Sequence, residues 1–172
     1  MADVLADHWR NALELSRAAG QAGLADSYEP KAIHYLVRAG DRARGLDTAA
    51  ATARYEAALA LTPPGHADRP DILLRFGSTA YHQLRFDEAI AALDEAIAAS
   101  ADDAQWQRRG RAMLARMLAI WETGDAAQNL NRATWLDDLL ALLEAHEPTP
   151  ELVDVLTERG IDRLTGSRQE EA

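Results

Sequence analysis

Residues 76–98 read FGSTAYHQLRFDEAIAALDEAIA, and residues 39–61 read AGDRARGLDTAAATARYEAALAL. Each stretch has a small residue in a first helix, a second small residue at the start of the next helix, then a large apolar residue and another alanine. The equivalent residues are 37 or 38 positions apart: Gly40 and Gly77, Ala51 and Ala89, Tyr55 and Leu93, Ala58 and Ala96. Small side chains allow two helices to cross closely, and large ones fill the space beside the next pair. The repetition therefore predicts two stacked helix pairs of one kind, with Gly40 and Gly77 at close crossings.

Apolar residues at three- and four-residue spacing predict helices in the rest of the chain as well. Pro30 and Pro150 favour helix starts, Asp47 can cap a helix, and Pro63 ends one. The alanine-rich composition favours helices, and no segment predicts a sheet. We expect an all-α chain with about eight helices near residues 1–19, 29–44, 48–62, 68–84, 86–97, 103–123, 126–145 and 150–164. The helical spacing favours core positions for the four tryptophans, Trp9, Trp106, Trp121 and Trp135.

The composition excludes several classes of protein. The chain has 172 residues, a net charge of −10 and no cysteine, so it holds neither a disulfide framework nor a cysteine-bound metal. It contains no run of eighteen apolar residues and no signal-peptide pattern, which predicts a cytoplasmic protein with no membrane contact. Because an excess of acidic residues repels phosphate groups, we do not expect direct binding of nucleic acid.

Sequence motifs for catalysis are also missing. Neither a GxxxxGK[ST] nor a GxGxxG string occurs, so we expect no phosphate-binding loop. The five histidines form no HExxH pattern, and no GxSxG string marks a nucleophile. Arg108, Arg109 and Arg111 form the tightest basic cluster, and we expect them to pair with acids such as Asp102 and Asp103. The sequence predicts a non-enzymatic chain without cofactor, metal or bound nucleotide.

The two repeated stretches resemble the tetratricopeptide repeat family. Residues 69–101 match its pattern at Leu73, Phe76, Gly77, Ala89, Leu93 and Ala96, although Ala80 stands where the family usually has tyrosine. Residues 32–63 match it less completely, at Leu36, Gly40, Ala51, Tyr55, Ala58 and Pro63. A pair from Met113 to Ala145 departs further, since Asn129 stands where the family prefers alanine. The resemblance implies that residues 1–172 form a single domain, a right-handed helical-repeat solenoid.

A narrower resemblance concerns three short strings. HYLVRAGDRA at 34–43, RYEAALAL at 54–61 and ADHW at 6–9 look like the repeat region of large actinobacterial signalling proteins. These include ATPase-linked transcriptional regulators and cyclase-linked relatives. The resemblance implies a non-catalytic scaffold in a larger regulatory protein, which contacts a protein or peptide partner or another domain of its own parent chain. The alternatives are an effector-sensing module with a small ligand or peptide in its groove and, third, a free-standing DNA-regulatory protein.

In such repeats the first helices of successive pairs line a concave groove. The resemblance places the following residues in or beside the groove: Val37, Arg38, Asp41, Arg44, Leu74, Arg75, Ser78, Tyr81 and His82. Exposed arginine, tyrosine and histidine suit an acidic or amphipathic segment of a partner. Packing and salt bridging between repeats is the alternative role for these residues. The family's clamp for a peptide carboxylate needs lysine and asparagine, which are missing there, so we do not expect that ligand class.

The C-terminal segment repeats the first half of a helix pair. Asp71 to Ala89 aligns with Asp154 to Ala172 at an offset of 83 residues, so the chain stops where a second helix would begin. We expect a fragment of a longer protein, or a homodimer that covers the incomplete repeat, and a natural C-terminus is the alternative. Leu152, Val155 and Leu156 should pack onto the preceding helix. This segment should be the least stable part of the chain.

Overall fold

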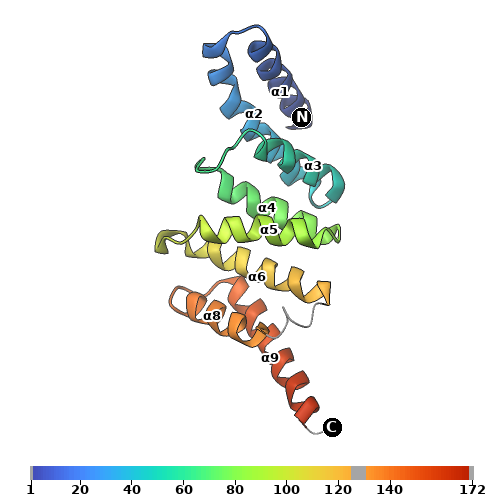
Figure 1. The fold of residues 1–172 in the computed structure, drawn as a ribbon, viewed down its shortest axis with the longest axis vertical. Helices are drawn as coiled ribbons and strands as arrows, with labels where there is room; N and C mark the ends of the chain where they lie inside the picture. Colours follow the sequence, from blue (N-terminus) through green and yellow to red (C-terminus); the bar gives the residue numbers. More distant parts are fainter. Residues whose placement is uncertain (1, 125–130, 171–172) are drawn as a thin grey trace. The chain divides into compact units, whose positions relative to one another are not determined.

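A computed structural model describes residues 2–124 and 131–170, with side chains through Ile161 (Figure 1). In these ranges the regular structure is entirely helical, and its eight α-helices confirm the predicted all-α class. The elements are α1 (Ala2–Ala18), α2 (Ala22–Ala43), α3 (Thr48–Leu59), α4 (Arg69–His82), α5 (Phe86–Ala98), the 3-10 turn η1 (Asp103–Gln105), α6 (Trp106–Thr123), α8 (Arg132–Glu144) and α9 (Pro150–Glu170). The predicted helix start near Ala126, and Asn129, lie outside the described residues. No helix in the described ranges has both the length and the apolar character needed to cross a bilayer.

The chain divides into two compact units, residues 1–85 and residues 86–172. In the first unit, α1 packs on α2, α2 on α3, and α3 on α4. In the second unit, α5 packs on α6, while α6, α8 and α9 pack on one another. Helices that follow one another in the sequence are therefore neighbours in space within each unit, as short connections require.

Helix α2 begins earlier than the sequence predicts. The prediction places Pro30 in its first turn, whereas the helix begins at Ala22 and runs through Pro30. The residues before the proline belong to the core of the first unit: Ala25 is buried, and the ring of Tyr28 lies 5.5 Å from that of Trp9 on α1. Burial against α1 stabilises this extra length of helix, although a proline inside it removes one backbone hydrogen bond.

Close helix crossings occur where the sequence has glycine. A Cβ atom on Gly40 of α2 would lie 2.5 Å from Cε1 of Tyr55 on α3, whose side chain is completely buried. The predicted crossing at Gly40 is therefore confirmed. Gly110 of α6 has the same role in the second unit, where a Cβ atom would lie 2.9 Å from Cδ2 of Leu143 on α8.

Two predicted helix ends are also confirmed. The carboxylate of Asp47 accepts a hydrogen bond of 2.9 Å from the N–H of Ala50 and caps the start of α3. Gly124 ends α6 in a left-handed conformation with a φ of 69°, which glycine adopts without a steric penalty.

The core of the second unit lies between α6, α8 and α9. Its buried cluster consists of Met117, Leu136, Leu139, Leu143 and Val155. Leu152 packs against this cluster as predicted, whereas Leu156 is 50% exposed and does not belong to the buried cluster. Successive residues of a helix lie about 100° apart around its axis, so burial of Val155 turns its neighbour Leu156 toward solvent.

Trp121 also differs from its predicted core position. Its side chain is half exposed, and the guanidinium carbon of Arg132 lies 4.2 Å from the centre of one of its rings. Arg132 is buried and pairs at 2.6 Å with Glu158 of α9. Trp121 therefore covers a buried cation at the edge of the unit instead of filling the apolar core.

Candidate functional site

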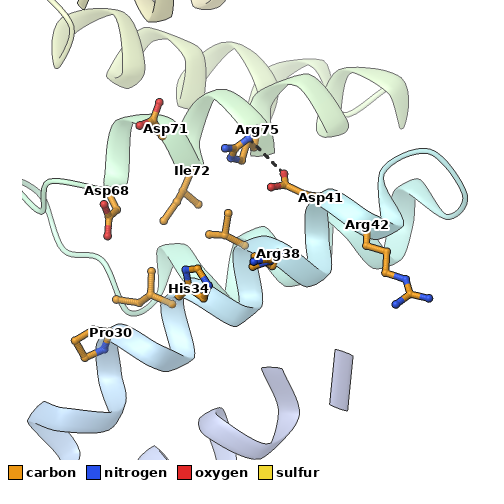
Figure 2. A pocket seen from close by; sticks show the side chains of 11 residues that line it. Pro30, His34, Arg38, Asp41, Arg42, Asp68, Asp71, Ile72 and Arg75 are labelled. Atoms are coloured by element: carbon orange, nitrogen blue, oxygen red, sulfur yellow. Dashed lines mark ion pairs between the residues drawn. The ribbon is translucent and has the colours of Figure 1, made fainter. Parts of the chain in front are cut away.

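A cleft of about 730 Å³ lies between α2 and α4 in the first unit (Figure 2). Helix α2 and the start of α4 supply all of its lining. The lining residues are Pro30, Ile33, His34, Val37, Arg38, Asp41, Arg42, Asp68, Asp71, Ile72 and Arg75. The volume falls in the range of roughly 300–1,000 Å³ that is usual for ligand sites.

The floor of the cleft is apolar. Ile33 and Ile72 are buried, and Val37 is half-buried. Residues 33 and 37 are four positions apart on α2, so both side chains lie on one side of that helix. The cleft therefore offers a narrow apolar strip to a partner, with polar side chains along its edges.

Asp41 joins the two walls at one end of the cleft. Its Oδ1 atom lies 3.3 Å from Nη1 of Arg75 on α4, the ion pair drawn in Figure 2. The hydroxyl of Tyr55 donates a hydrogen bond of 2.8 Å to the same oxygen. Burial, and then the bond to Asp41, raises the pKa of the Tyr55 hydroxyl above its usual value of 10.0. These contacts hold α2, α3 and α4 together beneath the cleft.

The charges are arranged differently on the two walls. His34, Arg38 and Arg42 follow one another at four-residue spacing along α2 and form a basic stripe. Arg38 and Arg42 are exposed and make no ion pair with any described residue. On the opposite wall, the acidic side chains of Asp68 and Asp71 lie at the start of α4, with Asp68 facing His34 across the cleft in Figure 2.

Arg75 retains unused hydrogen-bonding capacity. Its Nε atom is buried and has no hydrogen-bond partner among the described residues, while its Nη1 atom pairs with Asp41. A buried donor without a partner is costly. An acceptor oxygen from a bound segment would satisfy it.

The structure brings together only part of the predicted groove. Val37, Arg38, Asp41 and Arg75 line the cleft. The predicted residues that do not line it are Arg44, Leu74, Ser78, Tyr81 and His82. The residues that sequence reasoning missed are Pro30, Ile33, His34, Arg42, Asp68, Asp71 and Ile72.

The length of α2 explains why the predicted groove extends too far along α4. Asp41 lies opposite Arg75, and α2 ends at Ala43, so residues well beyond Arg75 have no facing residue on α2. Instead, the side-chain amide of Gln83 donates a hydrogen bond of 2.8 Å to the carbonyl oxygen of Thr48, at the start of α3. Tyr81 and His82 therefore lie past the end of the cleft.

Ser78 and Arg44 do not line the cleft. The hydroxyl of Ser78 donates a hydrogen bond of 2.8 Å to the backbone oxygen of Leu74, one turn earlier in α4. Arg44 follows the last residue of α2. His34 and Arg42 could have been predicted from the sequence, since they lie one helical turn on either side of Arg38 and so on the same face of α2.

Other candidate sites lack the required clustering. In the described ranges, no group of three or more histidine and acidic side chains is arranged to hold a metal ion. The predicted basic cluster is divided among separate contacts: Nε of Arg108 donates to the hydroxyl of Ser100 at 2.8 Å, and Nε of Arg111 pairs with Glu151 at 2.7 Å.

Comparison of the chain with protein-family models, curated proteins and solved structures found no match. The geometry and charge of the α2 and α4 cleft are therefore the basis for assigning a function.

Proposed function

We propose that this chain is a non-catalytic scaffold of the tetratricopeptide-repeat kind, whose cleft between α2 and α4 binds a segment of a protein partner. The observation that carries the proposal is the cleft itself, because it lies between the first helices of the two best repeats, residues 32–63 and 69–101. In a right-handed repeat solenoid these helices line the concave face.

The position of facing residues supports this assignment. Asp41 on α2 and Arg75 on α4 form an ion pair across the cleft, and each lies in the first helix of one of the two predicted repeats. Gly40 also occupies the small-residue position of the repeat and lies at a close crossing.

The chemistry of the walls favours an acidic, amphipathic segment. An apolar strip on such a segment would contact Ile33, Val37 and Ile72. Carboxylates one helical turn apart, at roughly 6 Å, would match the spacing of Arg38 and Arg42. Because Arg38 and Arg42 make no ion pair with a described residue, binding a carboxylate breaks no such pair, and each arginine gains a charge-assisted hydrogen bond.

Another domain of a larger regulatory protein is the partner that we propose first. The strings that resemble the repeat region of actinobacterial signalling proteins support this assignment. A cytoplasmic location and the absence of direct nucleic-acid binding remain part of the proposal. A second copy of the chain is the other candidate partner.

A small effector in the same cleft is the second candidate function. The volume of about 730 Å³ would hold a metabolite. However, no phenylalanine, tyrosine or tryptophan is among the described residues of the lining, and small-molecule sites are usually rich in such rings. The lining therefore favours a protein segment over an effector.

A random-peptide library selected against the whole chain tests the proposal. We expect enrichment of peptides with an apolar strip flanked by acidic residues one helical turn apart. Arg38→Glu should lower the affinity for the selected peptides by about tenfold or more, since it replaces attraction of their acidic residues with repulsion. Arg44→Glu is the matched control, because Arg44 follows the same helix but does not line the cleft. It should change the affinity by less than about threefold.

Three results would contradict the proposed function. The first is no enrichment of any peptide. The second is equal loss of binding in the Arg38→Glu and Arg44→Glu variants. The third is an affinity that does not fall as salt is added, since exposed charge pairs are screened by salt.

A further inference from the structure

The second unit contains a smaller pocket, of about 180 Å³, which the proposed function does not use. It is formed where α5, α6 and α8 meet. Its lining consists of Asp94 and Ile97 from α5, Met113, Arg116 and Met117 from α6, and Trp135 from α8.

The interior of this pocket is apolar and adaptable. Met117 is 3% exposed and belongs to the core cluster, while Ile97, Met113 and Trp135 are half-buried around it. Methionine side chains adjust to the shape of a bound group, and their sulfur atoms make favourable contacts with aromatic rings. A planar apolar group would therefore find suitable partners on several sides.

The charged residues at the rim already satisfy each other. Nε of Arg116 pairs with Oδ1 of Asp94, and the guanidinium carbon of Arg116 lies 5.3 Å from the centre of a Trp135 ring. A charged ligand would have to compete with this ion pair. The rim therefore favours a neutral occupant.

The size of the pocket limits the occupant to one ring. A cavity of roughly 150 Å³ with an apolar lining holds benzene, whereas complete small-molecule ligands occupy roughly 300–1,000 Å³. At about 180 Å³, the pocket accepts one phenyl-sized group and excludes most whole metabolites. Such a group is most readily supplied as a side chain of a larger partner, which is how buried aromatic residues anchor many interfaces.

We propose that this pocket binds a phenylalanine-type side chain from an uncharged segment of a partner protein. The site lies wholly in the second unit, and the proposal does not rest on the α2 and α4 cleft. Aromatic binding at the pocket and peptide binding at the cleft can therefore succeed or fail separately.

Methionine methyl groups provide a direct readout in the whole chain. The sequence has three methionines, and Met113 and Met117 both line the pocket, so Met1 serves as an internal reference. The chain would be labelled with ¹³C in the methionine methyl groups and titrated with N-acetyl-phenylalanine amide as the probe. We expect the Met113 and Met117 signals to shift together, with an affinity of about 1 mM for one isolated anchor, while the Met1 signal stays fixed. N-acetyl-alanine amide should cause no comparable shift.

Two substitutions on α5 distinguish binding of the probe in the pocket from binding elsewhere on the surface. Ile97→Trp should fill the pocket and lower the affinity for the probe by about tenfold or more. Ile90→Trp is the matched control, because Ile90 is also half-buried on α5 but does not line the pocket, and it should leave the affinity within about twofold. Methyl spectra of both variants check that the second unit remains folded.

Several results would overturn the inference. Absence of shifts at Met113 and Met117 would show that the pocket does not accept a ring. Equal weakening by the two α5 substitutions would place the probe elsewhere. Shifts that appear when the protein alone is concentrated would assign the pocket to a second copy. Tighter binding of free phenylalanine than of its neutral amide would assign it to an amino acid ligand.

Discussion

Gly40 is a residue at which one added carbon should destabilise the fold. A Cβ atom there would overlap Tyr55, which cannot move easily because it is completely buried and hydrogen-bonded to Asp41. We therefore expect Gly40→Ala to lower the free energy of unfolding by about 1–3 kcal/mol through overpacking. Denaturant unfolding of the purified variant would measure the loss.

The control for this prediction lies in the same helix. A Cβ atom on Gly23 would meet nothing within 4 Å. Gly23→Ala should therefore raise the free energy of unfolding by up to about 1 kcal/mol, since alanine favours the helix more than glycine does. If both substitutions changed stability in the same direction, the close crossing at Gly40 would lose its support.

The ion pair between Asp7 and Arg54 should make stability depend on pH. Asp7 Oδ1 accepts a hydrogen bond of 2.5 Å and Oδ2 one of 3.2 Å from the Arg54 guanidinium, which lowers the pKa of Asp7 below its usual 3.8. Because the folded state has the lower pKa, the pair stabilises the fold above pH 3.8, and this contribution is lost as the pH falls through the lowered value.

Asp7→Asn therefore should be less stable than the unmodified chain near neutral pH, and the difference should shrink toward zero at strongly acidic pH. Thermal unfolding at a series of pH values would measure it. Asp26→Asn is the control, since Asp26 makes no ion pair with a described residue. A difference for Asp7→Asn that stayed constant across the acidic range would show that the ion pair is not its cause.

At the scale of single helices, Pro30 is the clearest conflict between local preference and tertiary packing. It lies inside α2 and is exposed, so its ring contributes little to the core while it removes a backbone hydrogen bond. We expect Pro30→Ala to raise the free energy of unfolding by about 1–3 kcal/mol. A shift of the chemical unfolding midpoint would report the gain. Destabilisation by this substitution would mean that the proline is needed for the shape of α2.

The helices themselves were largely predictable from the sequence, because apolar spacing and end signals agree over most of the chain. The start of α2 was not, since Pro30 favours a helix start, whereas the burial of Ala25 and the contact of Tyr28 with Trp9 extend the helix back to Ala22. Tertiary burial overrides local propensity in such segments. A single sequence does not show which helix packs against such a segment.

The cleft was predictable only in part for a related reason. The resemblance to tetratricopeptide repeats placed Arg38, Asp41 and Arg75 in or beside one groove, and all three line the cleft. The prediction did not include where α2 ends relative to α4, so it assigned His82 to a groove that stops earlier. Val37 of the apolar floor was predicted, but Ile33 and Ile72 were not, because a buried isoleucine is more often a core residue than part of a site.

Helix α9 should be the least protected helix of the second unit. Val155 is buried against the core, but Val153, Leu156 and Ile161 are exposed, so one apolar side of the helix has no covering element among the described residues. Hydrogen exchange at residues 153–161 should therefore be faster than at residues 90–97 of α5. Equal protection in a demonstrated monomer would contradict this expectation.

At the scale of the whole molecule, the sequence repeats and the compact units have different boundaries. Residues 69–101 are the better-matching predicted repeat, yet α4 belongs to the first unit and α5 to the second. In a repeat array, stability is a sum of local terms and nearest-neighbour terms, so the places where cooperativity weakens need not coincide with the sequence period. The two units should therefore differ in local stability even within one repeated pattern.

A reciprocal pair of core substitutions tests whether the two units differ in local stability. Leu36 in the first unit and Leu136 in the second are both completely buried leucines, so Leu36→Ala and Leu136→Ala remove the same atoms from different cores. Each should cost about 2–5 kcal/mol in its own unit. Native-state hydrogen exchange should then show reduced protection mainly in α2 and α3 for the first variant, and mainly in α6 and α8 for the second. Equal loss of protection in all four helices for both variants would instead mean that the chain unfolds as one cooperative structure, because the energy of each core would then be shared across the division at residues 85 and 86.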